Sequence, residues 1–168
     1  MNSGIDLISF YTSRYFVSLE TLAEERGVDV AKYHDGLGQY RMAIPPPDED
    51  VVTMASSAAK PLLSSVERDS ISLLIFATES GVDQSKAAGL FAHKLLGLSS
   101  RCRVIEVKEA CYSGTAAIRL AAGLMENAPG ENALVLCSDV ARYDLGSPGE
   151  PTQGAGAVAM IINSTPRI

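Results

Sequence analysis

The run Ile71-Ser72-Leu73-Leu74-Ile75-Phe76-Ala77-Thr78 is almost uninterrupted in its apolar character. A run of this length and composition is typical of a strand buried on both faces, as in a parallel sheet covered by helices. Outward from it, helix-like runs alternate with further strand-like runs. Strands are expected at residues 4–11, 102–107, 133–137 and 157–162, and helices at 19–26, 29–33, 51–63, 85–96 and 116–127. This alternation predicts a layered α/β fold.

Capping and breaking residues set the expected ends of these elements. Ser18 is a candidate N-cap for the first helix and Gly27 ends it, while Gly36 and Gly38 are expected to break the chain after residue 33. Pro61 is expected to bend or end the third helix. The Gly/Pro-rich piece from residue 146 to 156 is the one long irregular stretch, and such loops are often functional.

Composition bounds the class of protein. The 168 residues, 46% of them hydrophobic, suffice for one domain with a substantial core. A net charge of -6 without a Lys/Arg cluster argues against nucleic-acid binding. Three cysteines without a secretory pattern, no signal peptide at residues 1–6 and no apolar run near 20 residues predict a cytoplasmic protein with no membrane span.

Cys111 begins the segment Cys111-Tyr112-Ser113-Gly114-Thr115, where a strand-like run gives way to a helix-like run. At such a junction, backbone N–H groups and the positive helix end favour a thiolate and can hold a developing oxyanion. That setting suits a nucleophile that carries an acyl group as a thioester. A lone cysteine is more often a small buried hydrophobe, but small, turn-forming flanks favour an exposed nucleophile here. Cys102 and Cys137 lie in apolar strand-like surroundings and are expected to be inert core.

Two acids follow strand-like runs. Glu79 comes directly after the run 71–78, and Asp139 follows the run 134–138. Carboxylates at the carboxyl ends of parallel strands lie where α/β proteins place reactive groups. With partial burial Glu79 becomes a usable general base, although a single acid at this position is more often a helix cap or solvated. Asp139 either orients the site or is structural.

The glycine-rich segment 149–157 lacks the Lys-Ser/Thr pair of a phosphate-binding P-loop and precedes a strand, so it favours close approach of a ligand or another strand. Within it, Thr152 either offers its hydroxyl to a substrate or stabilises a turn. His34 and His93 have no metal-ligand spacing with the cysteines, and no zinc site is expected.

Several motifs occur together in one order along nearly the whole chain. They are Phe76-Ala77-Thr78-Glu79-Ser80, Glu109-Ala110-Cys111-Tyr112, Ala141-Arg142-Tyr143, the run 149–160, and shorter pieces at 36–39 and 50–54. Together they resemble the N-terminal half of the bacterial 3-hydroxy-3-methylglutaryl-CoA synthases, condensing enzymes of the thiolase superfamily. The resemblance implies that residues 1–168 form one half of the αβαβα thiolase fold, with a mixed five-stranded sheet.

The resemblance also implies a reaction. Cys111 would take an acetyl group from acetyl-CoA as a thioester, and Glu79 would remove a proton from the acetyl methyl. The resulting enolate would attack the 3-keto carbon of acetoacetyl-CoA, and water would release the product for the mevalonate route. Asp29 and Thr152 match family positions that contact the acyl-CoA, and Asp139 matches an acid that supports the site. No cofactor or metal is implied beyond the CoA substrates.

One departure from the family pattern is large. The family enzymes have two similar halves, and their catalytic histidine and most CoA-contacting basic residues lie in the second half. Neither His34 nor His93 matches that histidine. The resemblance therefore implies a C-terminal half supplied by another polypeptide, in a heterotetramer, and a large apolar patch on the isolated half.

Two other functions compete with this one. Relatives in polyketide pathways add a β-branch to a chain held on an acyl carrier protein, which makes a carrier protein a second candidate partner. A non-catalytic half that only stabilises or regulates a full-length synthase is a hypothesis of another class. The presence of both Cys111 and Glu79 argues against that decoy, since it needs neither residue.

Overall fold

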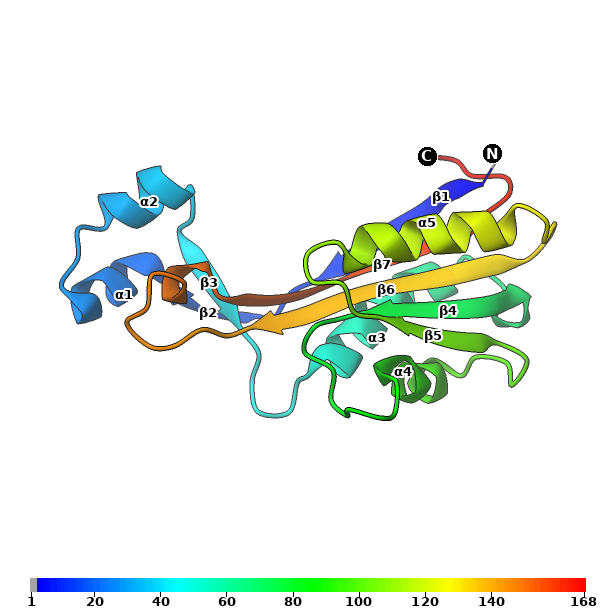
Figure 1. Cartoon of the computed structure of the whole chain (residues 1–168), viewed down its shortest axis with the longest axis horizontal. Coiled ribbons are helices and arrows are strands. Elements are labelled where there is room, and N and C mark those ends of the chain that lie inside the picture. The colour runs from blue at the N-terminus through cyan, green and yellow to red at the C-terminus, as the bar shows by residue number, and fades with distance from the viewer. Residues whose placement is uncertain (1–2) are drawn as a thin grey trace.

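The computed structural model describes residues 3–168 and has a five-stranded mixed sheet as the centre of its main body (Figure 1). Met1 and Asn2, which begin the stretch expected to lack a signal peptide, lie outside the described residues. The strands run in the order β1 (Gly4–Tyr11), β7 (Gly154–Asn163), β6 (Asn132–Ala141), β4 (Ile71–Ala77), β5 (Arg103–Val107). β4 pairs in parallel with β5 and β6, whereas β7 pairs antiparallel with β6 and β1. The predicted α/β fold and the five-stranded mixed sheet are confirmed.

Residues 3–168 form five α-helices. They are α1 (Leu19–Arg26), α2 (Ala31–Leu37), α3 (Val51–Leu63), α4 (Ala88–Leu96) and α5 (Ser113–Met125), with 3₁₀ turns η1 (Arg68–Ser70) and η2 (Glu150–Thr152). The predicted cap of α1 is present, because Ser18 accepts a hydrogen bond from Thr21 N and Gly27 ends the helix in the left-handed conformation. α3 begins with a reciprocal capping box between Asp50 and Thr53.

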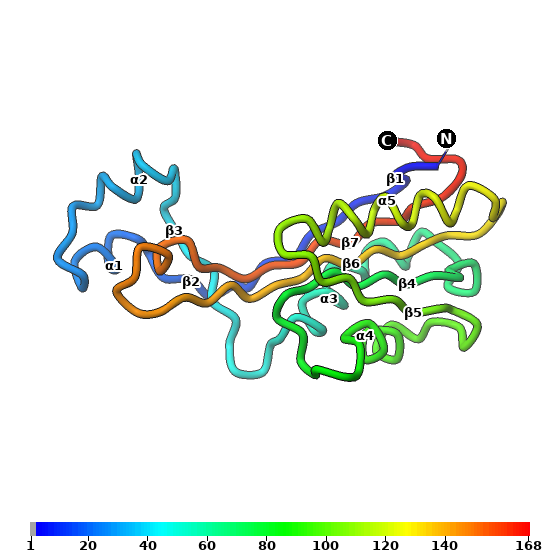
Figure 2. The backbone as a smooth tube through the Cα atoms, in the orientation of Figure 1, coloured from blue at the N-terminus to red at the C-terminus, as the bar shows by residue number. Residues whose placement is uncertain are grey.

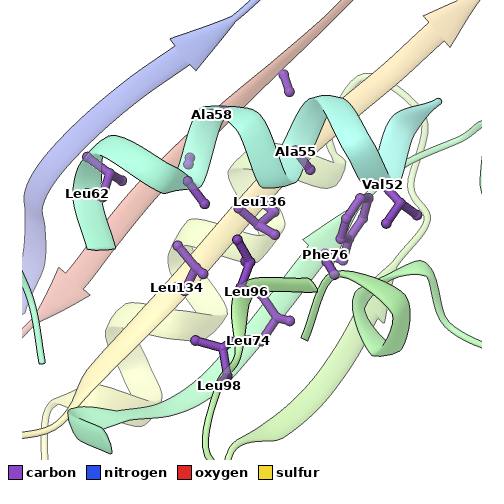
Figure 3. Close-up of a cluster of buried hydrophobic side chains, with 14 of the residues drawn as sticks. Val52, Ala55, Ala58, Leu62, Leu74, Phe76, Leu96, Leu98, Leu134 and Leu136 are labelled. Atoms are coloured by element: carbon purple, nitrogen blue, oxygen red, sulfur yellow. The ribbon is translucent and has the colours of Figure 1, made fainter. Parts of the chain in front are cut away.

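The two faces of the sheet bury different side chains, so the main body has three layers. On one face, α3 and α4 cover Leu74 and Phe76 of β4 together with Leu134 and Leu136 of β6 (Figure 3). On the other face, α5 covers the alternate residues, among them Leu73 and Ile75. This alternation explains the continuous apolar run in β4, because both faces of that strand are covered.

A small lobe extends from one end of the main body, beyond the long β6 and β7 (Figure 2). It contains α1, α2 and a two-stranded sheet of β2 (Tyr15–Ser18) and β3 (Arg41–Ile44), around a cluster of Leu19, Leu22 and Met42. These two strands were missing from the sequence-based prediction. Four-residue strands give too short a pattern to detect by alternation.

Several element boundaries differ from expectation. α4 begins at Ala88 rather than residue 85, because the Asp83 carboxylate accepts hydrogen bonds from the Ser85 and Lys86 N–H groups in a turn. The Glu106 carboxylate then accepts from Ala88 N at 2.6 Å and caps the helix from β5. No side-chain pattern local to α4 encodes that cap.

Glycine and proline break the elements less than expected. Gly36 lies inside α2, which continues to a left-handed Gly38, and α3 runs two residues past Pro61. β7 begins at Gly154, so the stretch expected to be irregular to residue 156 is shorter, and it also contains η2. Across residues 3–168, no helix is both long and apolar enough to cross a membrane.

Candidate functional site

Three parallel strands end at one edge of the sheet, and each delivers a residue predicted for the site. Glu79 follows β4, Cys111 follows β5 and precedes α5 by two residues, and Asp139 lies near the end of β6. The Cys111 residue is exposed, as predicted. Glu79 is also exposed, which corrects the expectation of partial burial, because the cavity beside it is open.

The residue before Cys111 has an unusual backbone. Ala110 has φ +49°, and it is the one residue other than glycine with positive φ among residues 3–168. An alanine in this region is strained, so surrounding contacts must hold it there. The chain turns at this residue, so that Cys111 lies between the end of β5 and the start of α5.

Glu79 supplies those contacts. Its Oε1 accepts hydrogen bonds from Ala110 N at 2.7 Å and from Ser113 Oγ at 3.1 Å. Ser113 in turn accepts a hydrogen bond from Glu109 N at 2.6 Å. One carboxylate oxygen is thus tied to residues on both sides of Cys111, which fixes the acid beside the thiol.

Asp139 holds the backbone of the residues around Glu79. Its Oδ1 accepts from Glu79 N at 2.8 Å and from Ser80 N at 3.0 Å. The hydroxyls of Thr78 and Ser80 donate to the same oxygen at 3.1 and 2.7 Å. The structure therefore places Asp139 behind Glu79, where it orients the loop that carries the acid.

A cavity of about 440 Å³ opens at this edge. Its lining comprises Glu79, Ser80, Ala110, Cys111, Asp139, Val140, Ala141, Arg142 and Tyr143. Arg142 and Tyr143 occur in a motif that the sequence analysis quoted, but no site role was predicted for them. Their position directly after the strand that carries Asp139 was the available signal.

The other two cysteines are chemically different from the exposed Cys111. Burial raises the pKa of the Cys102 thiol to about 11. Burial, followed by the nearby Asp139 charge, raises the pKa of the Cys137 thiol to about 11. Both thiols therefore remain protonated at neutral pH, in keeping with the inert role predicted for them.

The two predicted acyl-CoA contacts lie away from this cavity lining. Asp29 is exposed between α1 and α2, and its carboxylate accepts a hydrogen bond from Ala31 N. Thr152 is exposed in η2, where its hydroxyl donates to Gly149 O at 2.7 Å. The structure brings together Cys111, Glu79 and Asp139, whereas Asp29 and Thr152 stay predictions. Within residues 3–168, no three His, Cys, Asp or Glu side chains are grouped so that they could hold a metal ion.

The mixed five-stranded sheet, with Cys111 two residues before α5, fits the thiolase-type half that the sequence motifs imply. Comparison with known proteins narrows this class. The family described as hydroxymethylglutaryl-coenzyme A synthase N terminal matches residues 1–166, and the chain belongs to that family.

Its relatives are synthases of both kinds considered above. A hydroxymethylglutaryl-CoA synthase from Enterococcus faecalis is 46% identical over 168 residues, covering 100% of this chain and 44% of the relative. A polyketide-biosynthesis 3-hydroxy-3-methylglutaryl-ACP synthase from Bacillus subtilis is 37% identical over 183 residues, covering 100% and 43%. A crystal structure of HMG-CoA synthase complexed with CoA superposes with a TM-score of 0.96 at 46% identity, covering 100% and 43%. The chain thus spans less than half the length of these relatives.

Proposed function

We propose that this chain is the nucleophile-bearing half of a hydroxymethylglutaryl-CoA synthase. Cys111 takes the acetyl group of acetyl-CoA, with CoA thiol as the leaving group, and Glu79 removes a proton from the acetyl methyl. The enolate forms a carbon–carbon bond with the 3-keto carbon of acetoacetyl-CoA, the former keto oxygen takes up a proton, and water then cleaves the thioester to Cys111. The observation that carries this proposal is the pair of hydrogen bonds from Ala110 N and Ser113 Oγ to Glu79 Oε1.

These contacts suit the proposed roles. Both hydrogen bonds use Oε1, so Oε2 is the carboxylate oxygen left to take a proton from an acyl group on Cys111. A thioester on Cys111 lowers the cost of enolate formation. A non-catalytic partner would have no need for this arrangement.

The complete reaction requires a second half. We propose that the catalytic histidine and most CoA contacts come from a C-terminal half like that of the longer relatives, and that this half is a separate polypeptide in a heterotetramer. An intact-mass spectrum of the native protein tests this. A second polypeptide supports the proposal, whereas one longer chain carrying both halves overturns the requirement for a separate partner.

Acetylation of Cys111 tests the chemistry directly. The assembled protein is mixed with acetyl-CoA, quenched in acid, and analysed by peptide mass spectrometry for one added acetyl group. We expect the group on Cys111 in the wild type and in a Cys137→Ser control, and none at this site in Cys111→Ala. Acetylation elsewhere, or turnover that survives Cys111→Ala, contradicts the proposed nucleophile.

A second acceptor is supported by the similarity to the Bacillus subtilis ACP synthase. In that case the acceptor is a β-keto acyl chain on a carrier protein instead of acetoacetyl-CoA. Turnover with the two acceptors, compared at equal concentration, separates these functions. Failure with free acetoacetyl-CoA, with turnover on the carrier protein, would overturn the mevalonate assignment.

A further inference from the structure

A partly buried ion pair, in which the Arg26 side chain is 33% exposed, joins the small lobe to the loop between β6 and β7 that contributes Tyr143 to the candidate site. The Glu150 carboxylate, only 3% exposed, accepts from Arg26 Nε at 2.8 Å and from Arg26 Nη2 at 2.7 Å. Gly146 N donates to the same carboxylate at 2.8 Å. Arg26 lies at the end of α1 and Glu150 begins η2, so the pair links segments 124 residues apart.

Contacts within the loop from β6 to β7 join its residues to one another, so a change at Glu150, which anchors the loop, affects the rest of the loop. Tyr143 N donates to Gln153 Oε1 at 2.7 Å, and Thr152 is bonded to Gly149 O. A Cβ on Gly149 would lie 3.0 Å from Tyr143 Cγ, which means that the ring packs directly on the Gly149 backbone. Displacement of Glu150 would therefore also displace Tyr143, which lines the cavity with Cys111.

Each residue of the pair lies close in the sequence to one of the two predicted acyl-CoA contacts. Asp29 follows Arg26 by three residues, and Thr152 follows Glu150 by two. Figure 1 shows α1 and the loop with η2 side by side at the end of the molecule away from the termini. The pair therefore couples the lobe that carries Asp29 to the loop that carries Thr152 and Tyr143.

We propose that Arg26 and Glu150 are positioning residues that hold this loop and α1 in the geometry that binds acyl-CoA for transfer to Cys111. The proposal rests on the proposed function and assigns to the pair a role beyond stability. An ion pair is weak evidence for stability in itself, since the loss of hydration offsets much of its attraction. Its bidentate geometry, by contrast, fixes direction as well as distance.

A second bidentate pair in this chain provides a matched control. Arg167 donates to Asp6 at 2.6 and 2.9 Å, and Asp6 is 9% exposed. It ties the segment after β7 to β1, and neither residue lines the cavity. Glu150→Gln and Arg167→Gln thus each weaken one ion pair, but only Glu150 lies in the loop that is proposed to position acyl-CoA.

The test measures single-turnover acetylation of Cys111 against acetyl-CoA concentration in the assembled protein, with thermal unfolding of each variant. Glu150→Gln should raise the half-saturating acetyl-CoA concentration about tenfold or more, equivalent to ~1.4 kcal/mol. Arg167→Gln should leave the half-saturating acetyl-CoA concentration within about twofold of the wild-type value, because that ion pair lies away from the cavity and the substitution acts on stability alone. Arg26→Lys, which keeps the charge but loses the fork, should fall between wild type and Glu150→Gln.

Each outcome decides the proposal. Equal effects of Glu150→Gln and Arg167→Gln, or normal acetylation in Glu150→Gln, overturn the positioning role. If Glu150→Gln does not fold, the milder Arg26→Lys decides by the same comparison. Absence of acetylation in the wild type would instead refute the proposed function, and iodoacetamide labelling of Cys111 in every variant confirms that the thiol itself is intact.

Discussion

Gly89 allows α4 to pack closely against the sheet, and replacing it with alanine should destabilise the chain. A Cβ at this position would lie 2.7 Å from Val104 Cγ1 and 3.3 Å from Phe76 Cβ. The first distance is shorter than any relaxed carbon–carbon contact. Because the χ1 angle of valine is stiff, the side chain cannot turn away, and α4 must move off β5.

The size of the effect follows from two opposing terms. Overpacking a core costs about 1–3 kcal/mol, whereas the higher helix propensity of alanine contributes up to about 1 kcal/mol. The severe contact with Val104 puts the first term in its upper range, so we expect a net loss of about 1–2 kcal/mol. For a chain of this size, that corresponds to a fall in Tm of about 2–8 °C.

Gly123 is the matched control, because it also lies in a helix but a Cβ there would meet nothing within 4 Å. Gly123→Ala should therefore raise Tm, by about 1–4 °C for a gain of up to ~1 kcal/mol. Thermal unfolding followed by circular dichroism measures both variants. Opposite signs support the packing argument, while stabilisation by both substitutions would refute it.

Three further predictions concern charge and reactivity. The Arg26 guanidinium holds the pKa of Glu150 at about 2, below its usual 4.5, so the stability that the ionised Glu150 contributes is fully present above pH 4.5 and is lost as pH falls towards 2. In acid unfolding titrations, Glu150→Gln should remove this part of the pH dependence of stability. An unchanged pH profile in the variant would contradict the prediction. Iodoacetamide at neutral pH should label Cys111 in the folded protein, and Cys102 and Cys137 only after unfolding. Peptide mapping measures this order. Labelling of Cys137 in the folded protein would contradict the prediction. Asp139→Asn keeps the shape of the side chain but removes the charge that holds the loop carrying Glu79, the candidate base. The unfolding free energy should therefore fall by about 2 kcal/mol, and turnover should fall with it. Wild-type values for both would refute the role of Asp139 in orienting this loop.

The sequence predicted the elements whose signals are local. Ser18 and Gly27 define α1 through caps within a few residues, and the apolar run of β4 shows burial on both faces. The candidate site residues Glu79 and Asp139 could be singled out because each follows a strand-like run. By contrast, the start of α4 depends on Glu106, 18 residues away in another strand, and no local pattern contains it.

The contacts between distant segments at the candidate site could not be predicted from the sequence either. Tyr143 was quoted as part of a motif, but its place in the cavity that Cys111 also lines depends on the path of the loop from β6 to β7. The anchor of that loop is an arginine 124 residues from its carboxylate partner. Charge patterns along a sequence do not specify such partners, because either residue alone resembles an ordinary surface ion.

The hydrogen bonds around Glu79 have a consequence for the order in which folding creates function. Asp139 and the Glu79 amide are 60 residues apart, and the Glu79 carboxylate reaches Ala110 across 31 residues. These contacts join the ends of β4, β5 and β6, which meet only in the paired sheet. A chain in which these strands are unpaired therefore contains Cys111 without the Glu79 carboxylate tied to its neighbours, and under the proposed function thioester formation would report that the sheet is complete.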